Sequence, residues 1–90
     1  MNVHQMKVDI HCSDGTEKKI GLSLGVLVAY EIAFNQSFGK GVGTMQGQAW
    51  VTWRQCQKID PDTPSFEDWA ETVDRLYFDI PNPQIVQESG

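Results

Sequence analysis

Apolar and polar residues alternate along the first part of the chain, a pattern typical of a half-buried β-strand. The apolar positions are Met6, Val8, Ile10 and Cys12 before the Ser13-Asp14-Gly15 segment, and Ile20 and Leu22 after it. A two-residue Asp-Gly turn would leave the two apolar rows on opposite faces. A three-residue loop with Gly15 in the left-handed conformation instead pairs Val8 with Ile20 and Met6 with Leu22. We therefore predict a β-hairpin over residues 5–22 with this loop.

Residues 23–36 are apolar on nearly every side and predict a helix. Ser23 is a suitable N-cap, and the apolar residues that follow are Leu24, Val26, Leu27, Val28, Ala29, Tyr30, Ile32, Ala33 and Phe34. A helix of this kind belongs in the interior, so we expect it at the centre of the domain, under the hairpin. Its β-branched residues also suit a buried strand, but the length of the segment favours a helix. Glu31 is the exception, expected at the helix edge or paired with a basic residue.

The middle of the chain contains a glycine-rich segment followed by a second predicted helix. Gly39, Gly41 and Gly43 indicate a mobile loop, and their spacing does not match the G-x-x-x-x-G-K-[ST] pattern of a phosphate-binding loop. Thr44 then caps a helix predicted over residues 44–59. One stripe of that helix carries Met45, Ala49, Trp53 and Cys56, with Trp50 beside it.

A third helix is predicted over residues 65–77, after the turn DPDTP. Ser65 with Asp68 fits the [ST]-x-x-[DE] start signal, and Thr63 followed by Pro64 is an equally good cap. The apolar residues of this segment recur at helical spacing and are Phe66, Trp69, Ala70, Val73, Leu76 and Tyr77. The spacing predicts one continuous apolar helix face.

These elements together predict one small domain. A chain of 90 residues supports a single small core, and self-association as a homo-oligomer would help to stabilise it. We expect residues 1–80 to form an α+β domain, mainly α, in which an N-terminal β-hairpin is followed by a three-helix bundle. Residues 81–90 show no periodicity and predict a flexible C-terminal tail.

Composition and charge narrow the class of partner. No apolar run is long enough to cross a bilayer, and the first residues lack the features of a signal peptide, so we expect a cytoplasmic protein that is not secreted and does not bind membranes. The net charge is −5 and is unevenly distributed. From Asp60 onward the chain contains eight acidic residues and only one basic residue, Arg75. Phosphate binding needs clustered basic residues, which makes nucleic acid an unsuitable partner. A partly basic protein partner suits this acidic C-terminal region better.

No combination of residues predicts catalysis or metal binding. His4, His11, Cys12 and Cys56 supply two histidines and two cysteines, but they lack the paired spacing of a zinc site. A catalytic Cys12 would need a histidine base within hydrogen-bond reach. The adjacent His11 points to the opposite face of the predicted strand and cannot serve as that base. The cysteines are expected to be buried free thiols, kept reduced in the cytoplasm. We therefore expect a non-enzymatic protein with no cofactor.

The chain resembles the tail assembly chaperones of long-tailed, siphovirus-like bacteriophages over roughly residues 20–80. Members have a strand pair and then a helix ending in E-x-A-x-G, a helix containing A-W-x-x-x-R, and a last helix opened by a proline and F-x-x-F/W. The corresponding residues here are Glu31 with Ala33, Ala49-Trp50 with Arg54, and Pro64 with Phe66 and Trp69. The chain departs from the family pattern at two positions. Asn35 replaces a glycine that is common in the family, and Gln55 replaces the basic residue that often follows the arginine.

The resemblance implies a non-enzymatic role in tail assembly. Such chaperones bind the long, helical tape measure protein and keep it soluble while the tail tube protein polymerises around it. In many phages a programmed frameshift also makes a longer form that recruits the tube protein. On this basis we expect Trp50, Trp53, Arg54, Phe66 and Trp69 to form or support the client surface. The alternative for the four aromatic residues is an ordinary place in the core.

Two other functions fit the sequence. A small acidic inhibitor or antitoxin-like protein would block one basic protein partner through its third helix, and salt would weaken that complex. A minor head–tail structural component of a virion would remain in the finished particle, whereas an assembly chaperone would not.

Overall fold

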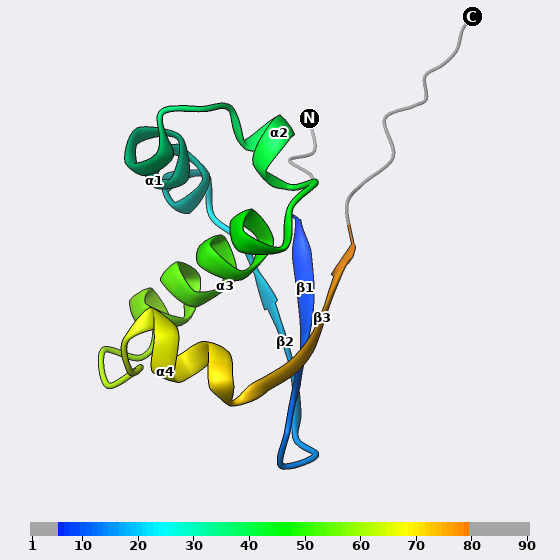
Figure 1. Cartoon of the computed structure of the whole chain (residues 1–90). Helices are drawn as coiled ribbons and strands as arrows, with labels where there is room; N and C mark the ends of the chain where they lie inside the picture. Colours follow the sequence, from blue (N-terminus) through cyan, green and yellow to red (C-terminus); the bar gives the residue numbers. More distant parts are fainter. Residues whose placement is uncertain (1–5, 80–90) are drawn as a thin grey trace, which may run out of the picture.

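The computed structural model describes residues 6–79, which form a three-stranded antiparallel sheet and four helices (Figure 1). In chain order the elements are β1 (Lys7–Cys12), β2 (Glu17–Gly21), α1 (Leu24–Phe34), α2 (Phe38–Gly41), α3 (Met45–Ile59), α4 (Phe66–Glu71) and β3 (Val73–Asp79). The predicted tail, residues 81–90, lies outside the described residues, as does His4.

The hairpin has the predicted register. Val8 lies opposite Ile20, and the backbone N–H of Leu22 donates to the Met6 carbonyl at 2.8 Å. Gly15 has a φ of +93°, which is the left-handed conformation expected of it. In the loop, Asp14 Oδ1 accepts hydrogen bonds from the Thr16 hydroxyl at 2.7 Å and the Thr16 N–H at 2.9 Å. These bonds favour the ionised carboxylate and lower the pKa of Asp14.

The predicted helix over 65–77 and the predicted three-helix bundle are wrong. Helix α4 ends at Glu71, and the chain continues as strand β3, which pairs with β1 so that the strand order is β2-β1-β3. In β3, Leu76 lies opposite Ile10 and Phe78 opposite Val8 on the inner face. The apolar residues of this segment fit the two-residue period of a strand as well as the period of a helix. Pairing with β1 provides hydrogen-bond partners for the second edge of that central strand.

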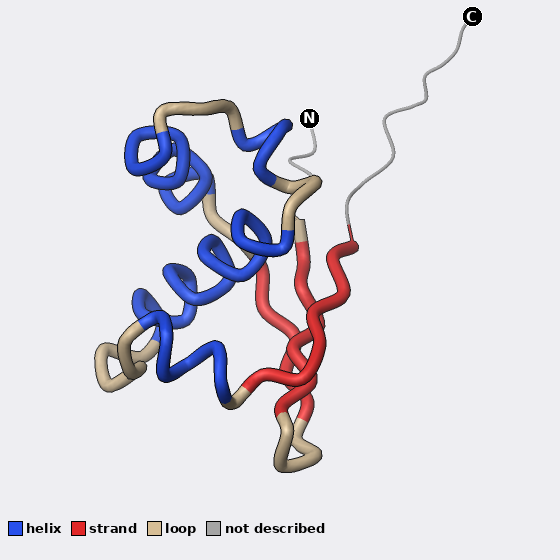
Figure 2. Tube along the Cα trace, in the orientation of Figure 1, coloured by secondary structure: helices blue, strands red, loops and turns tan. Residues whose placement is uncertain are grey.

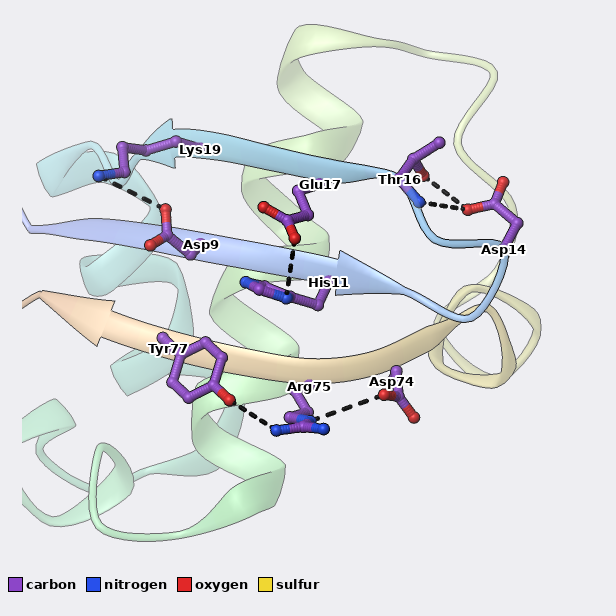
Figure 3. A network of polar contacts seen from close by, with 9 residues as sticks. All are labelled: Asp9, His11, Asp14, Thr16, Glu17, Lys19, Asp74, Arg75 and Tyr77. Atoms are coloured by element: carbon purple, nitrogen blue, oxygen red, sulfur yellow. Dashed lines mark hydrogen bonds and ion pairs between the residues drawn. The ribbon is translucent and has the colours of Figure 1, made fainter.

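All four helices lie on one side of the sheet, so the domain has two layers (Figure 2). The buried apolar core lies between the layers and consists of Val8, Ile10, Leu22, Val26, Tyr30, Phe38 and Val51. The outer face of the sheet is polar, with ion pairs between Lys19 and Asp9 at 3.5 Å and between His11 and Glu17 at 3.6 Å when the histidine is protonated (Figure 3). The sheet therefore buries one face only.

Helix α1 begins after the predicted cap but is not central. The Ser23 side chain accepts the N–H of Val26, whereas Val26 and Tyr30 are the only buried residues of α1. The side chains of Leu24 and Ile32 are 75% and 77% exposed. The expectation of a helix surrounded by other elements is therefore wrong, because α2, α3 and the sheet together cover one side of it.

Glu31 lies at the exposed edge of α1, as expected, and has a backbone partner rather than a basic residue. Its Oε2 accepts the N–H of Phe38 at 3.0 Å. This bond satisfies one of the free N–H groups at the start of α2, where a negative charge is also favourable.

The glycine-rich segment, predicted to be a mobile loop, contains the short helix α2. Ser37 caps it, and the side chain of Phe38 is buried. Gly41 and Gly47 are also buried, and a Cβ atom at Gly41 would overlap the Tyr30 ring. The glycines at 41 and 47 thus permit close packing of α2 against α1 and α3.

Helix α3 begins after Thr44, as predicted, but buries a different side from the one expected. Its buried residues are Gly47, Val51, Thr52 and Gln55, while Met45 of the predicted stripe is 86% exposed. The buried polar groups have partners: Thr52 donates to the Gln48 carbonyl at 2.8 Å, and Gln55 Oε1 accepts the Ser23 N–H at 2.9 Å. Apolar spacing alone did not reveal this side because two of its residues are polar.

Candidate functional site

A row of aromatic rings crosses the helical layer. We name its four half-buried members the aromatic belt, and they are Phe34, Trp50, Trp53 and Phe66. Ring centroids are 5.5 Å apart for Phe34 and Trp50, 6.0 Å for Trp50 and Trp53, and 5.5 Å for Trp53 and Phe66. All three pairs are edge-to-face, the geometry that aromatic quadrupoles favour.

Each end of the aromatic belt rests on a buried ring. Phe34 stacks on Tyr30 with centroids 4.6 Å apart, and Phe66 stacks on Trp69 at 6.4 Å. Tyr30 is 1% exposed and Trp69 is 7% exposed. The belt is therefore held at both ends by the interior while its own rings stay partly in contact with solvent.

Helix geometry and the turn before α4 place Trp53 on the outside of the helical layer. Trp53 is two residues from both Val51 and Gln55, which are buried, so it lies on the opposite side of α3. Its indole Nε1 donates to the Pro64 carbonyl at 2.9 Å. Thr63 also donates from Oγ1 to the Cys56 carbonyl at 3.2 Å. These bonds attach the turn to α3 and bring Phe66 against Trp53.

The structure brings the four aromatic residues expected at the client surface into one contact row. Three of them, Trp50, Trp53 and Phe66, are half-buried and belong to the belt, whereas Trp69 is buried and supports it from below. The fifth expected residue is Arg54, which is also half-buried.

Arg54 follows Trp53 on α3 and keeps unused hydrogen-bonding capacity. Its Nη1 donates to Gln57 Oε1 at 3.3 Å, and within residues 6–79 no carboxylate forms an ion pair with it. A guanidinium carries five N–H donors, so Arg54 retains donors for the acidic or carbonyl groups of a partner.

Sequence reasoning missed Phe34 as part of this site. It was expected in the interior with the rest of α1, but it is half-buried and contacts Trp50. The usable signal was its position four residues after Tyr30, which puts both rings on one side of α1, facing the tryptophans of the next long helix.

A groove of about 200 Å³ lies between α3 and the α4–β3 segment. It is lined by Met45, Gln48, Ala49, Trp69, Ala70, Val73, Asp74, Arg75 and Leu76. Ligand pockets generally have volumes of about 300–1,000 Å³, so this groove suits a single apolar side chain of a bound protein better than a small molecule. Trp69 connects it to the belt, because its ring lines the groove and stacks on Phe66.

The two cysteines line one cavity of about 340 Å³ near the end of the hairpin. Both are free and half-buried, so they are less buried than expected. Desolvation raises the pKa of Cys56 above its ordinary value of 9.0. A thiol with a raised pKa stays protonated and is a poor nucleophile near neutral pH, which argues against a catalytic role for Cys56.

The raised pKa of Cys56 predicts a loss of stability in alkaline solution. The folded state disfavours the thiolate, so the free energy of unfolding is unaffected by this group well below pH 9.0. It falls as the pH rises above that value, where the unfolded chain gains by ionising. Urea unfolding of wild type and Cys56→Val at several pH values checks this expectation. A decline of equal size in both proteins contradicts it.

Metal-ligating side chains are dispersed in the described part of the chain. Within residues 6–79 no three His, Cys, Asp or Glu side chains are arranged to share a metal ion. Over the same residues, every helix is too short or too polar to cross a membrane. Comparison with known proteins found no matching family model, no matching curated protein and no matching solved structure.

Proposed function

We propose that this protein is a non-enzymatic assembly chaperone that binds amphipathic helices of a larger client protein through the aromatic belt and Arg54. The observation that carries the proposal is the belt itself, a row of four half-buried rings across α1, α3 and α4. Tryptophan and arginine are the residues most often found at energetically dominant positions of protein interfaces.

The geometry of the belt suits a helical client. Its rings are fixed by mutual edge-to-face contacts and by buried rings at both ends, so little side-chain entropy is lost on binding. An amphipathic helix could lay its apolar side along the belt and place an acidic residue beside Arg54. On the resemblance, the client is a tape measure protein, the tail tube protein is a further partner, and the complex forms in the cytoplasm of the host cell.

Trp53→Ala tests the proposal. We expect it to weaken binding of a synthetic amphipathic helical peptide at least tenfold, about 1.4 kcal/mol, because one of the two inner rings of the belt is lost. Tryptophan fluorescence follows the binding, and thermal unfolding of each variant shows whether the fold is retained. Trp53→Phe keeps an aromatic ring and is expected to retain most of the affinity.

Tyr77→Ala is the matched control for an aromatic residue outside the belt. Tyr77 lies on the polar outer face of the sheet and is 47% exposed, so its loss should leave peptide affinity unchanged. If Trp53→Ala and Arg54→Ala are folded and bind the peptide as tightly as wild type, the belt is not the client surface.

A second function is favoured by the acidic surface around α4. Asp60, Asp62, Glu67, Asp68 and Glu71 are all exposed and form no ion pair within residues 6–79. Such a surface suits an inhibitor or antitoxin-like protein that binds one basic partner. A salt titration separates the two functions, because binding to the acidic surface weakens steeply with salt while binding to an apolar client changes little.

A further inference from the structure

The two ends of the aromatic belt lie on different helices. The rings follow one another in the order Phe34, Trp50, Trp53 and Phe66. Phe34 belongs to α1 and Phe66 to α4, and α3 with its two tryptophans lies between these helices (Figure 1). A difference in charge between the α1 side and the α4 side of α3 therefore acts along the row of rings.

The α4 end of the belt is acidic. Glu67, Asp68 and Glu71 follow Phe66 on α4, and all three are exposed. None of them forms an ion pair within residues 6–79, and α4 contains no basic residue. The aspartates of the turn before α4 add less, because they line a cavity together with a lysine of β2. The α4 end therefore presents three unpaired carboxylates to a partner.

The side of α3 that faces α1 carries cations. Arg54 is four residues after Trp50, so the two share one side of the helix, and Lys58 continues that side by one turn. The Lys58 Nζ donates to Ser23 Oγ at 3.5 Å, which places this side against the start of α1. Neither cation forms an ion pair in the described part of the chain. Glu31 is the one carboxylate of α1, and it already accepts a backbone N–H from α2.

The spacing of the rings suits a helix as the occupant of the belt. Successive ring centroids are 5.5, 6.0 and 5.5 Å apart, close to the rise of about 5.4 Å per α-helical turn. Side chains on one face of an extended strand repeat at about 6.7 Å and would fall out of step with the rings. A helix with one apolar residue per turn can therefore place a side chain against each ring.

We propose that the client helix is bipolar in charge and docks in one direction, with a basic N-terminal turn over α4 and an acidic C-terminal turn beside Arg54. This inference rests on the function proposed for the belt and specifies the class of helix that the belt accepts. In the opposite direction the carboxylates of the helix would face Glu67 and Glu71, and such like-charge contacts oppose binding. The macrodipole, positive at the N-terminus of the client helix, favours the same direction.

Two synthetic peptides of about 15 residues test the charge pattern. Both carry the same apolar residues and the same composition. The bipolar peptide has lysines in its first turn and glutamates in its last, and the interleaved peptide has both at each end. At low salt we expect wild type to bind the bipolar peptide about fivefold more tightly. At high salt the preference should disappear, because exposed charges are screened.

Reversing the charge of α4 should remove the preference. In the double variant Glu67→Lys, Glu71→Lys we expect the ratio of the two affinities at low salt to fall to about one. Because the same two peptides are compared, a difference in their intrinsic helicity cancels from the change in this ratio. Asp9→Lys, Glu17→Lys is the matched control, since it alters net charge equally on the outer face of the sheet. Circular dichroism shows that each variant is folded.

Cysteine cross-linking tests the direction of the helix. Ala70 is exposed and lies four residues after Phe66, so it shares that side of α4 without carrying a charge. In a Cys12→Ser, Cys56→Ser background, Ala70→Cys should form a disulfide faster with a bipolar peptide that bears an N-terminal cysteine than with one that bears a C-terminal cysteine. Copper phenanthroline serves as the oxidant. Equal rates, or a faster reaction at the C-terminus, contradict the direction.

The outcomes separate this inference from the proposal on which it rests. If wild type binds both peptides equally at low salt while Trp53→Ala weakens both, the belt is the client surface but does not select a bipolar helix. A preference that persists in Glu67→Lys, Glu71→Lys also overturns the inference. If Trp53→Ala leaves the binding of both peptides unchanged, the function proposed for the belt is wrong, and the inference fails with it.

Discussion

Tyr30→Ala is expected to lower the free energy of unfolding by about 4 kcal/mol, the largest effect of any single substitution considered. The Tyr30 side chain is 1% exposed, and its ring contacts Phe34, Phe38 and Trp50. Truncation would leave a cavity where α1, α2 and α3 meet. Small domains are marginally stable, so this variant should be partly unfolded at 25 °C.

Urea unfolding followed by far-ultraviolet circular dichroism measures this loss, with Tyr30→Phe as the control. Phenylalanine keeps the ring contacts and removes the hydrogen bond that Gln36 Nε2 donates to the Tyr30 hydroxyl at 2.6 Å. We expect that change to cost about 1 kcal/mol. If the alanine and phenylalanine variants lose similar amounts, Tyr30 is not the centre of the core.

Gly47→Ala is expected to lower the free energy of unfolding by about 3 kcal/mol. Helix propensity alone predicts the opposite sign, since alanine in place of glycine inside a helix stabilises by about 1 kcal/mol. A Cβ atom at Gly47, however, would overlap the backbone carbonyl of Gly41. Because backbone cannot rotate away as a flexible side chain can, α2 must separate from α3, and the buried contacts of Phe38 would weaken.

Gly39→Ala provides the matched control in the neighbouring helix. A Cβ atom there would meet nothing closer than the Ser37 hydroxyl at 3.8 Å, an ordinary contact distance. We expect this variant to be unchanged or slightly more stable than wild type in the same urea experiment. Equal stability of the Gly47 and Gly39 variants would contradict the close packing of α2 on α3.

Local signals in the sequence predicted the starts of the elements well. Ser23 and Thr44 each accept a backbone N–H three residues later, as predicted for these caps. Of the two candidate caps for α4, Ser65 rather than Thr63 accepts such a bond. Gly15 likewise fixes the hairpin register through its own backbone conformation. These features are decided by atoms within a few residues of each other, so the sequence is sufficient to read them.

Features that depend on distant partners could not be read in the same way. Val73, Leu76 and Tyr77 fit a helical period, and only the pairing of this segment with β1 makes it a strand. The burial of Gln55 depends on the backbone of Ser23, which is remote in sequence. The exposure of α1 was missed for a related reason, because periodicity does not show how many neighbours a helix will have.

In the candidate site, too, local motifs could be read from the sequence, whereas burial and long-range contacts could not. Family-like motifs pointed to Trp50, Phe66 and Trp69, and Trp53 was expected beside them on the client surface. The structure places these four residues in one row. The sequence did not show which of them is buried, nor that Phe34 extends the row, because both follow from how α1 and α4 pack on α3. Arg54 was found from its motif, and its available donors became visible only with its neighbours in place.

The strand order β2-β1-β3 has a consequence for synthesis on the ribosome. Strand β1 is central, yet one of its two neighbours is the last element of the described chain, and Lys7 pairs with Asp79. The hairpin and helices can emerge while one edge of β1 is still unpaired, which leaves the backbone N–H and C=O groups along that edge without partners. The sheet is completed only when β3 has left the exit tunnel, so the domain should fold late and slowly for its size.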